Sequence, residues 1–164
     1  MRELAEAVGI EPASIYSHYN SKEMMLWHIA KRCARDFLDS VEIVIARGHS
    51  LDQQLEQMIT THVEVTIRNQ DAAAVFDTEW QHLGQEKKLE YAAMRDKYEG
   101  YFRSTLQKGA ETGIFREVDP KFSALTILSA VNFTYKWYKP SGGLTPTEIG
   151  QELASTLLKG ILTK

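Results

Sequence analysis

Polar side chains gather near the start of the chain, at Ser14, Tyr16, Ser17, His18 and Lys22. Hydroxyl, imidazole and ammonium groups suit hydrogen bonds and ion pairs with phosphates, and hydroxyls also suit the edges of bases. Pro12 and Ala13 come directly before them, and these compact side chains would let a helix N-terminus approach a phosphate backbone closely. Packing does not require polar groups at these positions, so this stretch is the first candidate binding site.

Two short helices and a tight turn are expected to position these groups. Gly9 interrupts the first helix where the chain must adopt positive φ, and Pro12 fits the first turn of the second helix. Ala5 is small enough for the point where two helices cross steeply. The remaining apolar positions of the pair are Leu4, Val8, Ile10 and Ile15. This pattern predicts a helix-turn-helix, a unit whose second helix enters the major groove of DNA.

The stretch RELAEAVGIEPASIYSHYNSKEMML, residues 2–26, resembles the head of TetR-type transcriptional regulators. It combines an R-x-[IL]-A-x-x-x-G helix with a Y-x-H-[YF]-x-[ST]-K-E tail. The resemblance implies DNA contacts by Pro12, Ala13, Ser14, Tyr16, Ser17, His18 and Lys22, with Lys22 paired to a phosphate. Glu11 departs from the small or basic residue often found there, which argues against a base contact at that position.

The position of Met1 gives a further expectation. Members of the family carry another helix before the one at which this chain begins, and that helix is commonly basic. Residues 1–32 hold four basic and four acidic residues, and the net charge of the chain is −3, which is low for a DNA-binding protein. We expect either a start assigned too late or a truncated form. The first is favoured, because a head without its first helix would expose part of its core and bind operator DNA weakly or not at all.

Apolar residues recur at three- and four-residue steps through the rest of the chain, which predicts an all-α protein. The expected helices run from Ser21 to Gly48, 51–66, 72–83, 85–112, 120–138 and from Thr145 onwards. Thr145, Pro146 and Glu148 form the pattern of a capping box. We expect a helix-turn-helix domain with its connecting helix over residues 1–46 and an effector-binding and dimerisation domain over 47–164.

The segment 120–138 is apolar on nearly all sides, and such a helix must be covered on all sides. A second copy of the chain is the expected cover, with a flat face of the last helix around Leu153, Leu157 and Gly160. The resemblance implies a four-helix bundle formed by the last two helices of each copy, and a paired helix-turn-helix implies a palindromic operator. The alternative is a helix buried at the centre of a monomer.

Aromatic residues and a few polar ones in the body are suited to an apolar ligand pocket. The candidates are Met58, His62, Phe76, Trp80, Tyr91, Tyr98, Phe102, Asn132, Phe133 and Trp137. Ordinary core packing is the alternative for each of them. The segment NFTYKWYKPSGGLT and the later LLKGIL resemble the C-terminal body of regulators of lipid or steroid catabolism. That likeness implies an acyl-CoA-type effector, with a free hydrophobic compound as the competitor.

The sequence gives little support to other classes. His49, His62 and His82 lie on separate segments, and neither a glycine-rich phosphate loop nor a G-x-S-x-G motif occurs, so we expect no enzyme, metal site or cofactor. No apolar stretch approaches the ~20 residues that span a membrane. Cys33 is the single cysteine, which fits the reducing cytoplasm. The expected function is a ligand-responsive transcriptional repressor, and the alternative is a helical interaction or scaffold protein that has lost DNA binding through truncation.

Overall fold

The computed structural model describes residues 1–159 and 161. Every element assigned in that part is a helix, which confirms the predicted all-α class. The elements are α1 (Arg2–Ala7), α2 (Pro12–Tyr16), α3 (Lys22–Ala46), α4 (Leu51–Arg68), α5 (Gln70–Glu79), the 3-10 turn η1 (Trp80–His82), α6 (Gln85–Glu111), α7 (Pro120–Asn132), α8 (Thr134–Trp137) and α9 (Pro146–Leu158).

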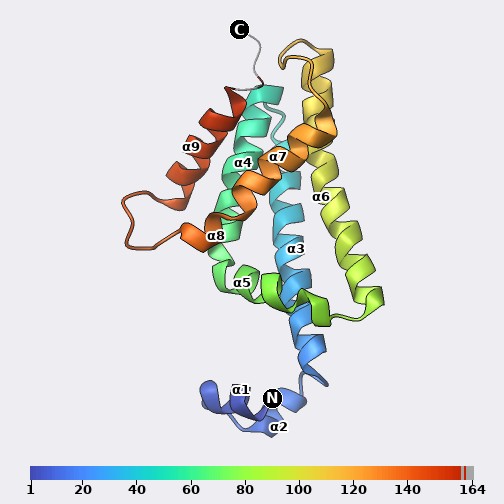
Figure 1. Ribbon diagram of the computed structural model, residues 1–164, viewed down its shortest axis with the longest axis vertical. Helices are drawn as coiled ribbons and strands as arrows, with labels where there is room; N and C mark the ends of the chain where they lie inside the picture. The colour runs from blue at the N-terminus through green and yellow to red at the C-terminus, as the bar shows by residue number, and fades with distance from the viewer. Residues whose placement is uncertain (160, 162–164) are drawn as a thin grey trace.

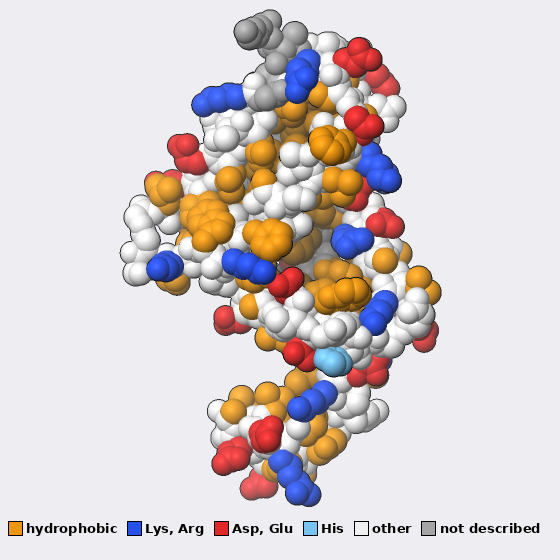
Figure 2. Space-filling model, in the orientation of Figure 1, with side chains coloured by type: hydrophobic (Ala, Val, Ile, Leu, Met, Phe, Trp, Pro, Cys, Tyr) orange, Lys and Arg blue, Asp and Glu red, His pale blue; other side chains and the backbone are white. Residues whose placement is uncertain are grey.

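The molecule is elongated, with a small head at one end and a larger helical body at the other (Figure 1). Helices α1 and α2 and the first turn of α3 form the head. Helix α3 then continues into the body, where it packs on α4, α5 and α6. Helix α7 packs on α4 and α6, and α9 packs mainly on α4. The space-filling view shows a narrow waist between the two parts (Figure 2). One continuous helix therefore connects the head to the body.

The head has the predicted helix-turn-helix geometry. Gly9 lies at φ 69°, and the backbone N–H of Ile10 donates to the Ala5 carbonyl over 3.0 Å, which closes the turn. Ala5 and Ile15 are buried where the two helices meet. Pro12 occupies the first turn of α2, as expected. Leu4, Val8 and Ile10, which were expected to pack, are exposed instead.

Several helix ends follow their predicted local signals. The Ser21 hydroxyl accepts the Met24 N–H over 3.0 Å and caps α3. At the start of α9, the Thr145 side chain accepts the Glu148 N–H, and the Glu148 carboxylate accepts the Thr145 N–H, so the capping box is confirmed. Gly48 and Gly113 follow the ends of α3 and α6.

Two of the predicted helix boundaries are wrong. The helix predicted over 72–83 begins at Gln70 and ends at Glu79, followed by η1. The single helix predicted over 120–138 is two helices, α7 and α8. Thr134 is fully buried, and its hydroxyl donates to the Val131 carbonyl over 2.9 Å, which takes up a backbone acceptor where α7 ends.

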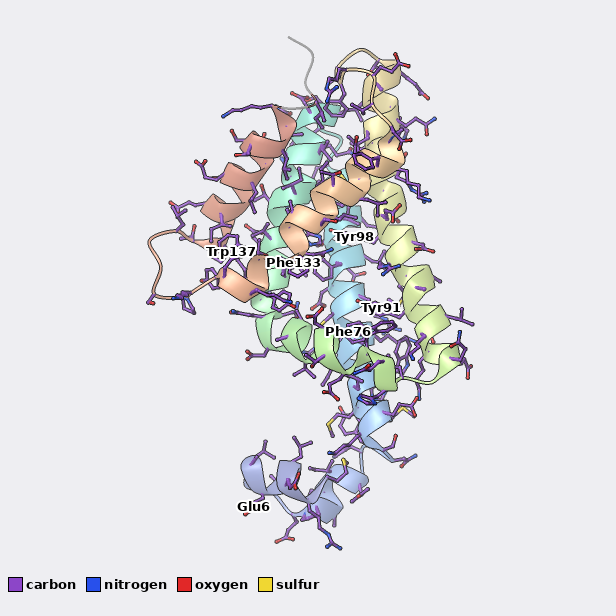
Figure 3. All side chains as sticks on the ribbon, viewed as in Figure 1. Glu6, Phe76, Tyr91, Tyr98, Phe133 and Trp137 are labelled. Carbon is purple, nitrogen blue, oxygen red and sulfur yellow. The ribbon has the colours of Figure 1, made fainter. Side chains whose placement is uncertain are left out.

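A small apolar cluster holds the lower end of α3 against α5, η1 and α6. Leu26, Trp27 and Leu83 are buried in it, and Phe76 and Tyr91 pack against it with their ring centroids 4.5 Å apart. Figure 3 shows the two rings facing each other from α5 and α6. This cluster fixes the helix that carries the head.

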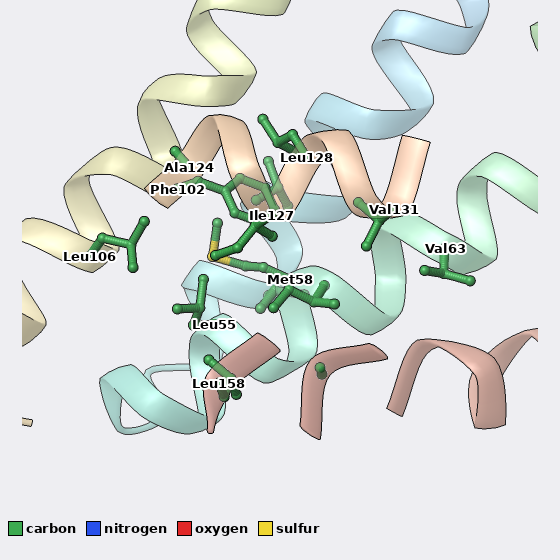
Figure 4. Close-up of a cluster of buried hydrophobic side chains, with 14 of the residues drawn as sticks. Leu55, Met58, Val63, Phe102, Leu106, Ala124, Ile127, Leu128, Val131 and Leu158 are labelled. Carbon is green, nitrogen blue, oxygen red and sulfur yellow. The ribbon is translucent and has the colours of Figure 1, made fainter. Parts of the chain in front are cut away.

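A second, larger cluster forms the main core of the body, and Figure 4 shows part of it in close-up. Its centre consists of apolar side chains from α3, α4, α6, α7 and α9, among them Val41, Leu55, Met58, Phe102, Leu106, Ile127, Val131 and Leu158. Helices α4 and α9 approach closely because Gly150 faces α4, where a Cβ atom would lie 2.7 Å from the Thr60 Cα. The packing between α4 and α9 is therefore tight.

Candidate functional site

The predicted DNA-binding residues lie together on the outer surface of the head. Ala13, Ser14, Tyr16, Ser17 and His18 are exposed on and directly after α2, Pro12 is half-buried, and Lys22 is exposed at the first position of α3. The Ser17 hydroxyl donates to the Ser14 carbonyl over 2.7 Å, so its lone pairs are the part left for another partner. The structure thus brings these residues to one surface next to the N-terminus of a long helix, where anions bind well.

The junction between head and body is tied by one carboxylate. Glu23 accepts a hydrogen bond from the Lys87 ammonium over 2.7 Å and from the Gly84 N–H over 3.0 Å. The bond from Lys87, and next the bond from Gly84, lower the pKa of Glu23 below its usual value. The carboxylate is therefore charged at neutral pH, and it fastens the foot of α3 to the start of α6.

A cavity of about 700 Å³ lies in the body between α3, α4, α5, α6 and α7. Figure 3 shows the labelled aromatic residues around this region, and Figure 2 shows a hollow below α7. Seven of the ten candidate effector residues line the cavity: His62, Phe76, Trp80, Tyr91, Tyr98, Asn132 and Phe133. Its size is typical of a pocket for a small molecule.

The other three candidates do not line the cavity. Met58 and Phe102 are buried in the main core. Met58 lies one helical turn before His62 on α4, and Phe102 lies one turn after Tyr98 on α6. Trp137 is about half exposed on the short helix α8. The helical period places Met58 and Phe102 on the correct faces, but the closer packing of α7 fills the space around them.

Sequence reasoning missed several lining residues. Thr66 on α4, Asn69 at the C-cap of α4, and Cys33 and Phe37 on α3 belong to the wall. The available signal was the polar spacing 62, 66 and 69 within an otherwise apolar helical stripe. Cys33 is half-buried, and desolvation raises the pKa of its thiol, so this group stays protonated.

A chain of hydrogen bonds crosses the cavity wall from α6 to α7. The Tyr98 hydroxyl lies 3.0 Å from His62 Nδ1, and His62 Nε2 lies 3.0 Å from Asn132 Oδ1. The amide oxygen can only accept, so Nε2 carries the proton and Nδ1 accepts from Tyr98. Burial lowers the pKa of His62 to about 4 and raises that of Tyr98. These three hydrogen-bonded side chains are therefore uncharged at neutral pH.

Charged residues line the cavity only where the wall is exposed or half-buried. They are Asp77, Lys88, Arg95 and Glu99. Asp77 pairs with Lys136 over 3.1 Å, and the Lys88 ammonium donates to the Gln81 carbonyl and lies over the Trp80 ring. The cavity thus combines a neutral, buried polar wall with a charged rim.

Large apolar side chains remain exposed along α7 and α8. Phe122 is 72% exposed, and Leu125, Phe133 and Trp137 are each about half exposed. Figure 2 shows hydrophobic side chains gathered over these helices. On α9, Leu153 and Leu157 are half-buried against the core, and Gly160 lies outside the described residues. A face of this kind is typical of a protein–protein contact.

Within residues 1–159 and 161, no three His, Cys, Asp or Glu side chains come together in an arrangement that could hold a metal ion. No helix in the same part is long and apolar enough to cross a membrane.

Comparisons with known proteins agree with the geometry of the head and body. Residues 48–161 match the family model described as "Tetracyclin repressor-like, C-terminal domain". The HTH-type transcriptional repressor KstR2 of Rhodococcus jostii (strain RHA1) is 25% identical over 163 residues, which cover 98% of this chain and 80% of the relative.

Solved structures show the same fold. The ketosteroid transcriptional regulator KstR2 of Mycobacterium tuberculosis matches with a TM-score of 0.92 at 22% identity, covering 99% of this chain and 84% of that one. The regulator AibR, solved in complex with isovaleryl coenzyme A and operator DNA, matches with a TM-score of 0.81 at 23% identity, covering 94% and 84% of the two chains. Because the family model matches more than half of the chain, and the head has the helix-turn-helix geometry of such proteins, this chain belongs to the TetR family of ligand-responsive, DNA-binding transcriptional regulators.

Proposed function

We propose that the chain is a homodimeric repressor that leaves a palindromic operator when a small apolar effector fills the cavity in its body. The observation that carries this proposal is the continuity of α3. Lys22, its first residue, belongs to the predicted DNA-contact residues, while Ala30, Cys33 and Phe37 line the cavity. One helix thus connects the two candidate sites. We expect such a regulator to act in the cytoplasm, where its operator lies.

The physical link between the two sites is mechanical. From Lys22 to Phe37, α3 is a rod of roughly 22 Å at 1.5 Å per residue. An effector that fits only when α3 tilts away from α6 would displace the head, because the head joins the body through α3, whose lower end packs on α5 and α6 through Leu26 and Trp27. The effector then shifts the population toward a head spacing that no longer matches successive major grooves.

The DNA-binding half of the proposal can be tested with fragments selected by the protein from a random DNA library. Lys22→Ala is expected to weaken binding to all selected sequences about equally and to flatten the salt dependence by roughly one unit. Ser17→Ala is expected to change the preference among operator variants. Fluorescence anisotropy against salt concentration measures both. An unchanged affinity and slope in Lys22→Ala would place the DNA contact elsewhere.

The dimer is supported by the exposed apolar residues of α7 and α8 and by the need of paired helix-turn-helix units to lie about 34 Å apart. Such an interface is expected to bury more than about 1,200 Å². Phe122→Glu should give a monomer in sedimentation, because it places a charge in this face. Leu89→Glu is the matched control, since Leu89 is similarly exposed but lies on α6. A wild-type monomer would contradict the two-half-site mechanism.

The effector proposed first is a free hydrophobic compound, since most of the cavity wall is apolar and aromatic. An acyl-CoA-type compound is the second candidate. It is favoured by Arg95 and Lys88 at the rim, which could meet phosphates, and by the likeness to AibR, which was solved with isovaleryl coenzyme A. Arg95→Gln separates them: it should weaken the release of DNA by an acyl-CoA and leave release by an uncharged compound unchanged.

A helical interaction protein without DNA binding is the alternative function. The exposed Leu4, Val8 and Ile10 on the head favour it, because a protein partner could cover them. The selection experiment decides between the two. A dimer that enriches no DNA sequence from the library would support the interaction protein.

A further inference from the structure

A row of buried polar side chains follows one face of α4. His62 and Thr66 are four residues apart on α4, and Asn69 follows three residues later as the C-cap of the helix, so the three lie in sequence along one side. Each is at most 9% exposed, and all three line the cavity. A polar row facing the cavity from the middle of an apolar core requires partners, because burying a polar group without a hydrogen bond is unfavourable.

Two members of the row have partners. His62 bonds to Tyr98 and Asn132 through its two ring nitrogens. The Asn69 amide donates to Asp36 Oδ2 over 3.2 Å and to the Val65 carbonyl over 3.0 Å. Thr66 differs, since its hydroxyl has no hydrogen-bond partner among the residues that the structure describes, although the side chain is only 3% exposed. The Thr66 hydroxyl is therefore the group in this row to which a ligand could supply a hydrogen bond.

The surroundings of Thr66 limit the chemistry of that ligand. One turn earlier, His62 occupies the oxygen of the Asn132 amide, which leaves the amide N–H groups to donate. The nearby imidazole is neutral, because burial lowers its pKa to about 4. The basic lining residues, Lys88 and Arg95, belong to the exposed or half-buried part of the wall. An anion at Thr66 would lose its hydration and find no cation to compensate.

We propose that the Thr66 hydroxyl, in the cavity that the Asn132 amide also lines, binds an uncharged oxygen carried on the otherwise apolar body of the effector. Ketone, ester or thioester carbonyl oxygens and hydroxyl groups share this chemistry. The inference rests on the proposed effector role of the cavity and adds that the hydrogen bond selects among apolar compounds. A site built to bond an oxygen rejects the analogue that lacks it more strongly than an apolar pocket rejects a change of size.

The selectivity test uses three probes with the same ten-carbon body: decane, 2-decanone and decanoate. Quenching of the tryptophan fluorescence of the full chain at pH 7.5 reports their binding, because Trp80 lines the cavity. The wild-type protein should bind 2-decanone at least about tenfold more tightly than decane or decanoate. Equal binding of decane and 2-decanone, or tightest binding of decanoate, would overturn the assignment of a neutral oxygen site while leaving an apolar effector possible. Absence of binding by all three would count against the effector cavity itself.

The role of Thr66 is tested by Thr66→Val, which keeps the shape and removes the hydroxyl. The preference for 2-decanone should disappear, while the melting temperature should stay the same or rise, because the variant lacks the unpartnered polar atom. Thr66→Ser should restore the preference. A structural role would give the opposite result, a lower melting temperature with the preference intact, and would overturn the proposal.

Thr105→Val is the matched control. Thr105 is equally buried, but its hydroxyl donates to the Tyr101 carbonyl and accepts from the Gln54 amide, and it does not line the cavity. Its valine variant should melt at a lower temperature and keep the preference for 2-decanone. A loss of preference in Thr105→Val as well would show that any buried threonine produces the effect, and the assignment to Thr66 would fail.

Discussion

The head and the body of this regulator differ in how much apolar surface each buries. In the helix-turn-helix only Ala5 and Ile15 are buried, and Leu4, Val8, Ile10 and Tyr16 remain exposed. The body buries a continuous core contributed by α3, α4, α6, α7 and α9. Since apolar burial contributes about 25 cal/mol per Å², the body has its own source of stability and the head has little.

This difference has a mechanical consequence. The head depends on α3 for its position, because α1 and α2 pack mainly on each other and the chain continues from them into that helix. A small tilt of α3 can therefore reposition the DNA-binding surface. A regulator needs this combination, in which one part responds to a ligand and the other follows as a unit.

The largest contrast is expected between core deletions in the two regions. Phe102→Ala should lower the free energy of unfolding of the body by about 3–5 kcal/mol, because it leaves a cavity in the main core. Ile15→Ala should change the same transition by less than about 0.5 kcal/mol and still abolish DNA binding, because the head opens locally. Urea unfolding followed by tryptophan fluorescence measures the first effect. Equal destabilisation by the two variants would mean that head and body unfold as one unit.

Acid is expected to act on the body through His62. The folded state holds this imidazole at a pKa of about 4, against about 6.5 when unfolded, so below pH 6.5 the unfolded chain binds a proton that the folded chain does not. Stability is complete above pH 6.5 and falls toward pH 4, by roughly 3 kcal/mol at most. Urea unfolding of wild type and His62→Gln between pH 7.5 and 4.5 isolates this contribution. Parallel pH profiles would contradict a buried neutral imidazole.

Replacing either of two glycines with alanine should be destabilising, for a different reason at each position. At Gly109 a Cβ atom would lie 2.0 Å from the ring of the buried Phe115, so Gly109→Ala should destabilise the body by about 1–3 kcal/mol. At Gly9 there is free space but φ is 69°, so Gly9→Ala should cost about 1–2 kcal/mol confined to the head. Thermal unfolding and DNA binding, measured together, should separate the two. A lower melting temperature of the body in Gly9→Ala would contradict an effect confined to the head.

The smallest contrast concerns two helix caps. Ser21→Ala and Thr145→Ala each remove a side-chain acceptor from a helix N-terminus, at a cost of about 1 kcal/mol. We expect Thr145→Ala to lower the stability of the body and Ser21→Ala to reduce DNA affinity, because Ser21 lies beside Lys22 at the junction with the head. Unfolding curves and anisotropy titrations distinguish the outcomes. Identical profiles would show that the cap at Ser21 supports the body as well.

Local signals predicted most helix boundaries. Gly9, Ser21, Gly48 and the Thr145–Glu148 capping box each act on residues within one turn, so their effect depends little on the rest of the molecule. The break between α7 and α8 was missed because it depends on the burial of Thr134, which only the surrounding helices produce.

The cavity was predicted in part. Helical periodicity placed the aromatic candidates on inward faces, and seven of the ten line the cavity. Helical periodicity predicts which face of a helix points inward, but it does not predict at which positions along that helix a neighbouring helix packs against the face. Met58 and Phe102 therefore appeared equivalent to His62 and Tyr98, although the crossing of α7 leaves one pair in the dry core and the other at the cavity.

The sequence by itself determined the helix-turn-helix, the all-α class and the family resemblance, because these depend on residue type and short-range spacing. Only the tertiary structure decided which polar groups meet. His62 bonds to Tyr98 and Asn132, which are 36 and 70 residues away, while Thr66, one turn along the same helix, has no partner in the described part of the chain. Contacts over such separations depend on the angles and depths at which helices pack, which are set by the whole core rather than by any one segment.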